Sequence, residues 1–130
     1  MQTKKFLLAT ILITATGLLQ GCMLAVVGVG AAGTIAYIRG DLEAVEPESL
    51  DAVYEATLSA VKELELTVTE KPKDALEARI VVHDSQDRKI TIKLKNTAEN
   101  TTKLSIRVGT FGSETRSRLI YQKIREHLNK

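Results

Sequence analysis

The 130-residue chain has no tryptophan, a single cysteine, three tyrosines and two phenylalanines. One cysteine excludes an intramolecular disulfide. So few aromatic side chains argue against a stacking platform for bases or sugars, and they require a core built from aliphatic residues. The two histidines, His83 and His127, lie far apart in the sequence, with no cysteine or acid at metal-ligand spacing. We therefore expect no zinc or other metal site and no cofactor.

Sequence patterns that carry catalysis are also missing. The chain has no G-x-S-x-G nucleophile elbow. Asp84 and Asp87 share a polar turn, but two acids are too few for a calcium loop. Residues 28–33 match G-x-G-x-x-G, yet a helix is expected to begin near Glu48, where a dinucleotide site needs the acidic end of a second strand. We expect a protein that is not an enzyme.

The amino terminus has the layout of a secretory signal peptide. Lys4 and Lys5 form a basic start, and residues 6–19 form an apolar run that is short for a membrane span. The next residues, Leu19-Gln20-Gly21-Cys22, resemble the lipobox of bacterial lipoproteins. This resemblance implies cleavage before Cys22 and acylation of that cysteine. The alternative is an uncleaved membrane anchor over residues 6–38 that contains a lone buried cysteine.

The signal divides the chain into three expected parts. Residues 1–21 form the lipoprotein signal peptide, residues 22–38 the lipidated cysteine with an apolar glycine-rich segment, and residues 39–130 a periplasmic domain. Residues 23–38 carry no charge, and as a helix they would span about 24 Å. We expect this segment to lie against lipid or to pack on a neighbouring helix through its glycines.

The mature chain is expected to be formally neutral. Loss of Lys4 and Lys5 lowers the number of basic residues from 18 to 16, which equals the 16 acidic residues. Overall charge therefore gives no argument for nucleic acid as a partner.

Apolar periodicity predicts an α+β fold for residues 39–130. Ser49 is placed to cap a helix whose apolar residues recur at spacings of three and four: Leu50, Val53, Tyr54, Thr57, Val61 and Leu64. Alternation with a period of two then predicts strands within residues 64–69, 76–82, 90–94 and 104–108, and a short first strand is compatible with residues 36–45. Ser113 begins a last helix with a buried face of Leu119, Ile120, Ile124 and Leu128.

Short turns between successive strands require antiparallel pairing. We expect a two-layer sandwich in which an antiparallel sheet of four to five strands carries two helices on one face.

The outward positions of the last two strands are strongly basic. They include five cations and no acid: Lys89, Lys93, Lys95, Lys103 and Arg107. Such a face suits an anionic partner, which could be an envelope protein, a phosphorylated lipid headgroup or an acidic glycan. The alternative is a solvated face whose lysines oppose edge pairing and aggregation.

The chain is similar to a family of small bacterial envelope lipoproteins that is classed only as a domain of unknown function. The similarity rests on four stretches: Gly21-Cys22, Tyr37-Ile38-Arg39-Gly40-Asp41-Leu42, Val53-Tyr54-Glu55-Ala56-Thr57 and Ile106-Arg107-Val108-Gly109-Thr110-Phe111-Gly112. It implies a lipid-anchored periplasmic domain and brings no known catalytic residues.

Resemblance to lipoproteins at large also implies a location. Retention at the inner membrane is associated with Asp after the cysteine, whereas Met23 and Leu24 follow here. We therefore expect an outer-membrane lipoprotein facing the periplasm, held by acylated Cys22 and residues 23–38, that acts as a non-enzymatic binding or accessory module. The alternative is a small periplasmic enzyme or ligand carrier with a cleft between sheet and helices.

Overall fold

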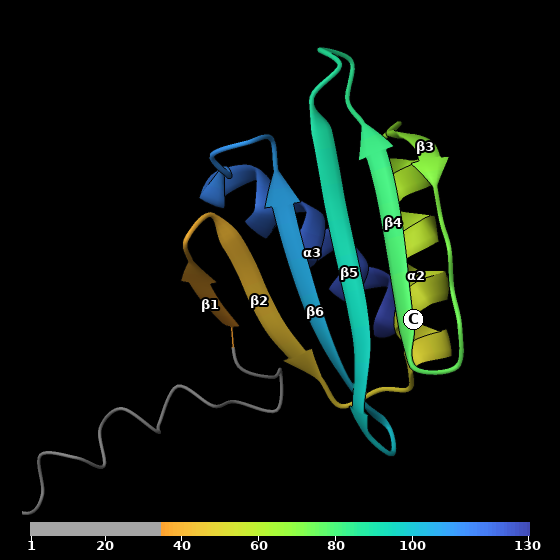
Figure 1. Ribbon diagram of the computed structural model, residues 1–130. Helices are drawn as coiled ribbons and strands as arrows, with labels where there is room; N and C mark the ends of the chain where they lie inside the picture. The colour runs from red at the N-terminus through yellow and green to blue at the C-terminus, as the bar shows by residue number, and fades with distance from the viewer. Residues whose placement is uncertain (1–34) are drawn as a thin grey trace, which may run out of the picture. The chain divides into compact units, whose positions relative to one another are not determined.

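The computed structural model describes residues 35–130 (Figure 1). The expected signal peptide, the lipobox residues Leu19, Gln20 and Gly21, the lipidation site Cys22 and residues 23–34 lie outside the described part. The elements follow in the order β1 (Ile35–Ile38), β2 (Asp41–Glu46), α2 (Leu50–Glu63), β3 (Thr67–Glu70), β4 (Glu77–His83), β5 (Lys89–Ala98), β6 (Thr101–Val108) and α3 (Glu114–Leu128).

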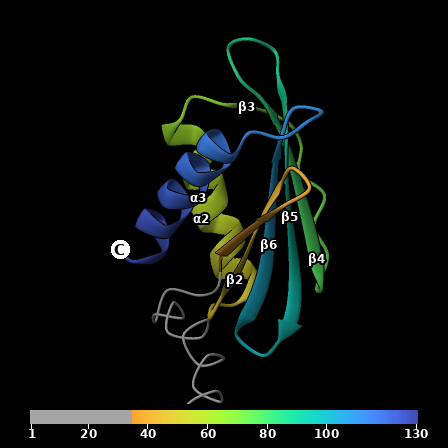
Figure 2. The same cartoon turned by 90° about the vertical axis from the view of Figure 1, so that its left-hand side faces the viewer.

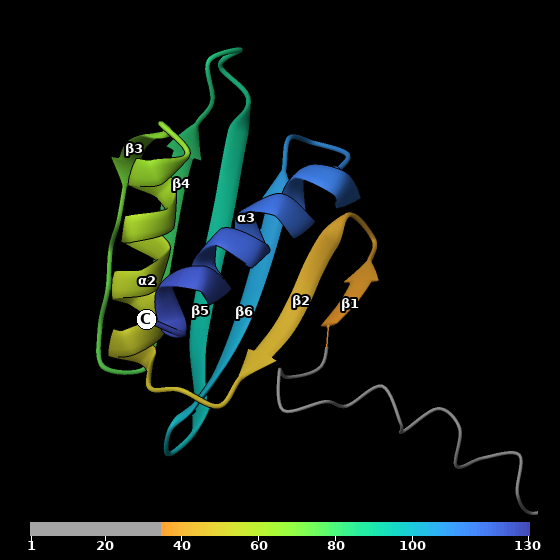
Figure 3. The ribbon, with the colours of Figure 1, turned by 180° about the vertical axis from the view of Figure 1, so that it is seen from behind.

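The strands form one antiparallel sheet in the order β1-β2-β6-β5-β4-β3. Both helices pack on the same face of this sheet, as Figures 2 and 3 show. The predicted α+β class and the two-layer arrangement are therefore confirmed. The opposite face is not covered by any element of residues 35–130.

The sheet has six strands because residues 36–45 hold two strands rather than one. Arg39 and Gly40 both adopt positive φ, 52° and 90°, between Ile38 and Asp41. This two-residue geometry reverses the chain in a tight hairpin. The sheet consequently begins at Ile35, so residues 35–38 form an edge strand of the domain expected to start at residue 39.

Helix α2 follows the predicted pattern closely. The hydroxyl of Ser49 accepts a hydrogen bond from the backbone N–H of Ala52 at 3.2 Å, and Asp51 lies in the first turn, where a negative charge is favourable. The buried side chains include Leu50, Val53 and Val61. The cap and the apolar stripe together account for where the helix begins and which face it buries.

Helix α3 differs from the expectation in its details. It begins after Ser113 as predicted, but the Ser113 side chain makes no capping hydrogen bond. Ile120 and Ile124 are buried, whereas Leu119 is half exposed, so the prediction of a buried Leu119 was wrong. Tyr121 occupies the buried position instead, because the sheet lies against the face that carries residues 117, 120, 121 and 124.

The core is mainly aliphatic, as the scarcity of aromatic residues predicted, and Tyr54 and Tyr121 are its aromatic members. Its fully buried large side chains come from both layers: Leu42, Ile80, Ile90, Ile92, Leu94, Leu104, Ile106, Ile124, Val53, Val61 and Val82. Phe111 contributes nothing to it, since 92% of this residue is exposed. None of the helices in residues 35–130 is long and apolar enough to cross a membrane.

Candidate functional site

The strand register places the predicted cations on the open face of the sheet. Lys93 lies opposite Ser105, and Lys95 lies opposite Lys103, across the β5–β6 pair. Strand β4 adds Arg79, an outward position by the alternation of that strand but not one of the five predicted cations, and it lies directly opposite Lys93. Lys89 lies at the start of β5 opposite His83, away from this group.

Acids on neighbouring strands compensate three of these cations. The ammonium of Lys95 lies 3.5 Å from a carboxylate oxygen of Glu77 on β4, and that of Lys103 lies 3.0 Å from Glu43 on β2. The guanidinium of Arg107 lies 3.3 Å from Asp41, also on β2. The absence of acid from β5 and β6 therefore does not extend to the whole face, because β2 and β4 flank these two strands.

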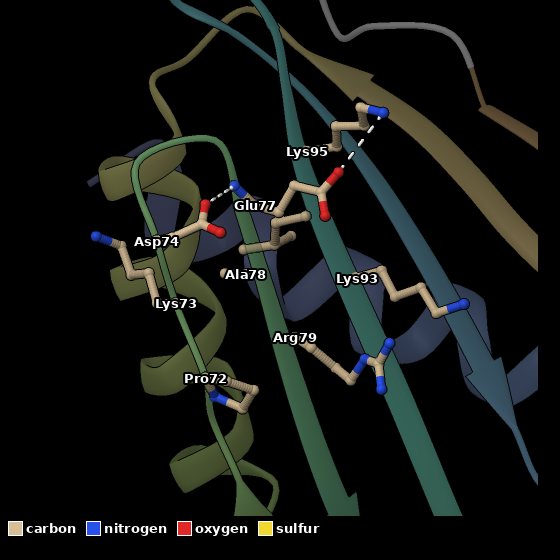
Figure 4. A pocket seen from close by; sticks show the side chains of 9 residues that line it. Pro72, Lys73, Asp74, Glu77, Ala78, Arg79, Lys93 and Lys95 are labelled. Carbon is tan, nitrogen blue, oxygen red and sulfur yellow. Dashed lines mark hydrogen bonds and ion pairs between the residues drawn. The ribbon is translucent and has the colours of Figure 1, made fainter.

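Arg79 and Lys93 remain uncompensated. No carboxylate within the described range lies within 4 Å of either side chain. In Figure 4 both side chains extend over the sheet in the direction of β6, with Glu77 and Lys95 paired beyond them. Like charges placed directly opposite each other on two strands destabilise the pair. The structure thus holds two adjacent positive charges without an internal counter-ion.

Two shallow hollows adjoin this pair. The first has a volume of about 400 Å³ and is lined by Pro72, Asp74, Glu77, Arg79 and Lys93, among others. The second has a volume of about 310 Å³ and is lined by Asp41, Thr91, Lys93, Ser105 and Arg107. Lys93 is the residue that lines both. Thr91 and Ser105 therefore line the same hollow as Lys93.

Asp74 is the acid that faces the first hollow from the connection before β4. Its Oδ1 accepts hydrogen bonds of 2.8 Å from the backbone N–H groups of Leu76 and Glu77. These two bonds lower the pKa of the Asp74 carboxyl below its usual value. Asp74 is thus an ionised acid engaged with the backbone of its own turn.

A buried polar cluster between β2 and α3 was missed by the sequence analysis. Glu46 is only 2% exposed, its Oε1 accepts a short hydrogen bond from the Tyr121 hydroxyl, and its Oε2 lies 3.9 Å from Nε of Arg125. A signal was present in the sequence, because Glu46 continues the inward alternation of Leu42 and Ala44 along β2. This cluster fixes α3 to the sheet.

Burial, reinforced by the hydrogen bond to Glu46, raises the pKa of Tyr121 to about 12. The neutral phenol is favoured in the folded state, so its contribution to stability is complete below pH 10, the ordinary pKa, and is lost between pH 10 and pH 12. We expect wild type to lose about 2 kcal/mol more than Tyr121→Phe over this interval. Urea unfolding followed by circular dichroism measures the difference, and parallel pH profiles for the two proteins would contradict it.

The other residues considered for catalysis or metal binding lie apart. His127 contacts Glu63 on α2 at 2.8 Å, whereas His83 ends β4. Asp84 accepts hydrogen bonds from the backbone of Gln86 and Arg88, as expected for an aspartate in a turn. Within residues 35–130 no group of three or more His, Cys, Asp or Glu side chains could hold a metal ion.

Comparison with known proteins gives a family without a known activity. The family described as "Protein of unknown function (DUF3568)" matches residues 5–127, which include all the strands and almost the whole of α3. None of the curated proteins matches the chain.

Proposed function

The chain belongs to the DUF3568 family, whose function is unknown, and we propose that it is a lipid-anchored envelope lipoprotein that binds an anionic partner without catalysing a reaction. The observation that carries the binding role is the open sheet face, where Arg79 and Lys93 have no carboxylate of residues 35–130 within 4 Å. A face that presents charged side chains from a hydrogen-bonded sheet suits recognition, because the backbone that carries them need not be ordered on binding.

The anchoring role rests on the sequence before the sheet. Leu19-Gln20-Gly21-Cys22 supports acylation of Cys22, and Met23 supports delivery to the outer membrane, facing the periplasm. Residues 23–34 separate this cysteine from β1 and could reach at most about 40 Å. The domain would therefore work close to the membrane surface, within reach of envelope proteins, lipid headgroups and acidic glycans.

Substitution of Cys22 tests the anchor. We expect Cys22→Ala to accumulate as a longer, unprocessed chain that incorporates no labelled fatty acid, because acylation needs the thiol. Met23→Ala, adjacent to the lipobox but outside it, should be processed and labelled like wild type. Gel mobility and mass spectrometry of the mature amino terminus provide the measurement. A wild-type chain that keeps residues 1–21 and carries no lipid would instead establish the uncleaved anchor.

A cleft between sheet and helices is the basis of the alternative role as an enzyme or ligand carrier. The hollow in that place is lined by Leu66, Ile90, Arg116, Leu119 and Ile120, among others, and has a volume of about 240 Å³. Pockets for small-molecule ligands are usually about 300–1,000 Å³. The hollow between sheet and helices is therefore smaller than a usual ligand pocket and smaller than the two hollows beside Lys93, of about 400 and 310 Å³. This difference in volume favours the open face as the binding surface.

A further inference from the structure

We propose that Arg79 and Lys93 form a binding site for a phosphate group. This inference names the ligand class of the open face, so it rests on the binding part of the proposed function and is independent of the lipid anchor. It follows from a comparison of two like-charged pairs on the same sheet.

Both pairs consist of cations directly opposite each other on neighbouring antiparallel strands, but their surroundings differ. Lys95 and Lys103 lie directly opposite each other on β5 and β6, and each has an acid within 3.5 Å, Glu77 and Glu43 respectively. Arg79 and Lys93 lie directly opposite each other on β4 and β5, and neither has an acidic partner within 4 Å among residues 35–130. Repulsion between directly opposed charges costs stability in the free protein. A ligand that supplies negative charge between them removes this cost.

The number and type of donors favour phosphate over a single carboxylate. Two uncompensated positive charges match the charge of a phosphate monoester, which is about −1.5 to −2 at neutral pH. The guanidinium of Arg79 offers a planar fork of donors for two phosphate oxygens, and the ammonium of Lys93 acts as a point charge. Thr91 and Ser105 line the adjoining hollow together with Lys93, and their hydroxyl groups are the further donors we assign to the remaining oxygens.

The acids that line the first hollow do not neutralise Arg79 or Lys93, because both acids have other partners. Asp74 is held by the backbone of its turn, and Glu77 is directed toward Lys95, as Figure 4 shows. Asp74 lies on the β3 side of β4, whereas the side chain of Glu77 extends over β5, as those of Arg79 and Lys93 do. Asp74 would therefore border the site and limit how far an anionic group can move toward β3.

A thermal unfolding experiment on the full chain in detergent tests this site with a charge-matched control. Arg79→Gln with Lys93→Gln removes the proposed site, and Lys95→Gln with Lys103→Gln removes the same charge from the compensated pair. For a Kd of about 1 mM, about 10 mM phosphate should raise the Tm of wild type by about 5–10 °C relative to chloride at equal ionic strength. The control should keep this shift, and the site variant should bind at least about tenfold more weakly and lose most of it.

The apo proteins supply a second readout. Without phosphate, the Tm of the site variant should equal or exceed that of wild type, because the variant lacks the repulsion between Arg79 and Lys93. The Tm of the control should not exceed that of wild type, because the control loses two ion pairs. Absence of a phosphate shift in wild type overturns the proposal. Equal loss of the shift in both double variants also overturns it, because the effect would then follow net charge alone.

Amine labelling of the wild-type chain distinguishes a soluble phosphate ligand from a lipid headgroup. The full chain is placed in phosphatidylcholine vesicles, either with inorganic phosphate or with phosphatidate in the bilayer, and lysine acetylation is read by mass spectrometry. Protection of Lys93 relative to Lys95 in the first arm indicates a soluble phosphate ligand, and protection confined to the second indicates a headgroup. No selective protection in either arm overturns the site. Cys22→Ala in the first arm should leave protection unchanged, which separates failure of the anchor from failure of the site.

Discussion

Replacing Gly112 with alanine is expected to lower the free energy of unfolding by about 3 kcal/mol or more. The residue lies in the loop between β6 and α3 at a φ of 81°, where an L side chain is strained. A Cβ there would meet the carbonyl oxygen of Gly40 and would lie 2.5 Å from Gly40 Cα and 2.7 Å from the Tyr37 hydroxyl. Since two of these atoms belong to the backbone, the clash cannot be relieved by a rotamer change.

The contact matters because it joins two turns that are distant in sequence. A Cβ on Gly40 would likewise lie 2.7 Å from the carbonyl oxygen of Phe111, so the two backbones approach each other without intervening side chains. Nη1 of Arg107 donates a hydrogen bond of 3.0 Å to the carbonyl of Arg39 in the same hairpin. Separation of the turns would therefore loosen the β1–β2 hairpin from β6 and the start of α3.

Gly109→Ala is the matched control for this prediction. Gly109 lies in the same loop at a φ of 70°, but a Cβ there would meet nothing within 4 Å. The Gly109→Ala substitution should lower the free energy of unfolding only by the backbone strain, about 1 kcal/mol. Urea unfolding followed by circular dichroism compares the two variants. Equal losses would show that the close approach to Gly40 contributes nothing.

Local periodicity was sufficient to predict the layers, and it failed where a helix had to end. The alternation of Leu64, Leu66 and Val68 predicted a strand from residue 64, but β3 begins at Thr67. Glu65 adopts a φ of 56°, as the chain leaves α2, so Leu64 and Leu66 pack against the core from the connection. A residue in the left-handed conformation is common after a helix, but it is usually glycine, so a glutamate at this position gives no sequence signal for the end of the helix.

Alternation along the strands also predicted which cations share a face, but not which of them are compensated. Compensation depends on sheet order, and β2 lies beside β6 although about 60 residues separate them in the chain. Asp41 and Glu43 therefore reach Arg107 and Lys103 through a pairing that no local pattern specifies. The uncompensated pair of Arg79 and Lys93 becomes visible only once the register is known.

Replacing Glu46 with alanine is expected to cost about 3–5 kcal/mol, the range for breaking a buried ionic contact from one side. The change removes the acceptor of the Tyr121 hydroxyl and the carboxylate that faces Arg125, at a position that is almost fully buried. Glu43→Ala on the same strand is the matched control. Its carboxylate pairs with Lys103 on the open face, where an ion pair contributes about 1 kcal/mol or less.

A double-mutant cycle assigns the loss to the hydrogen bond rather than to the volume of the removed side chain. Tyr121→Phe should destabilise wild type by about 1–3 kcal/mol, because the buried carboxylate loses its donor. In the Glu46→Ala background the same change should destabilise the protein less, since the carboxylate that accepts from the Tyr121 hydroxyl is already gone and only the contact with Arg125 remains. Urea unfolding of the four proteins gives the coupling energy. Additive losses would mean that the hydrogen bond between Tyr121 and Glu46 does not contribute to stability, and that any loss from Glu46→Ala comes from its contact with Arg125 or from its volume.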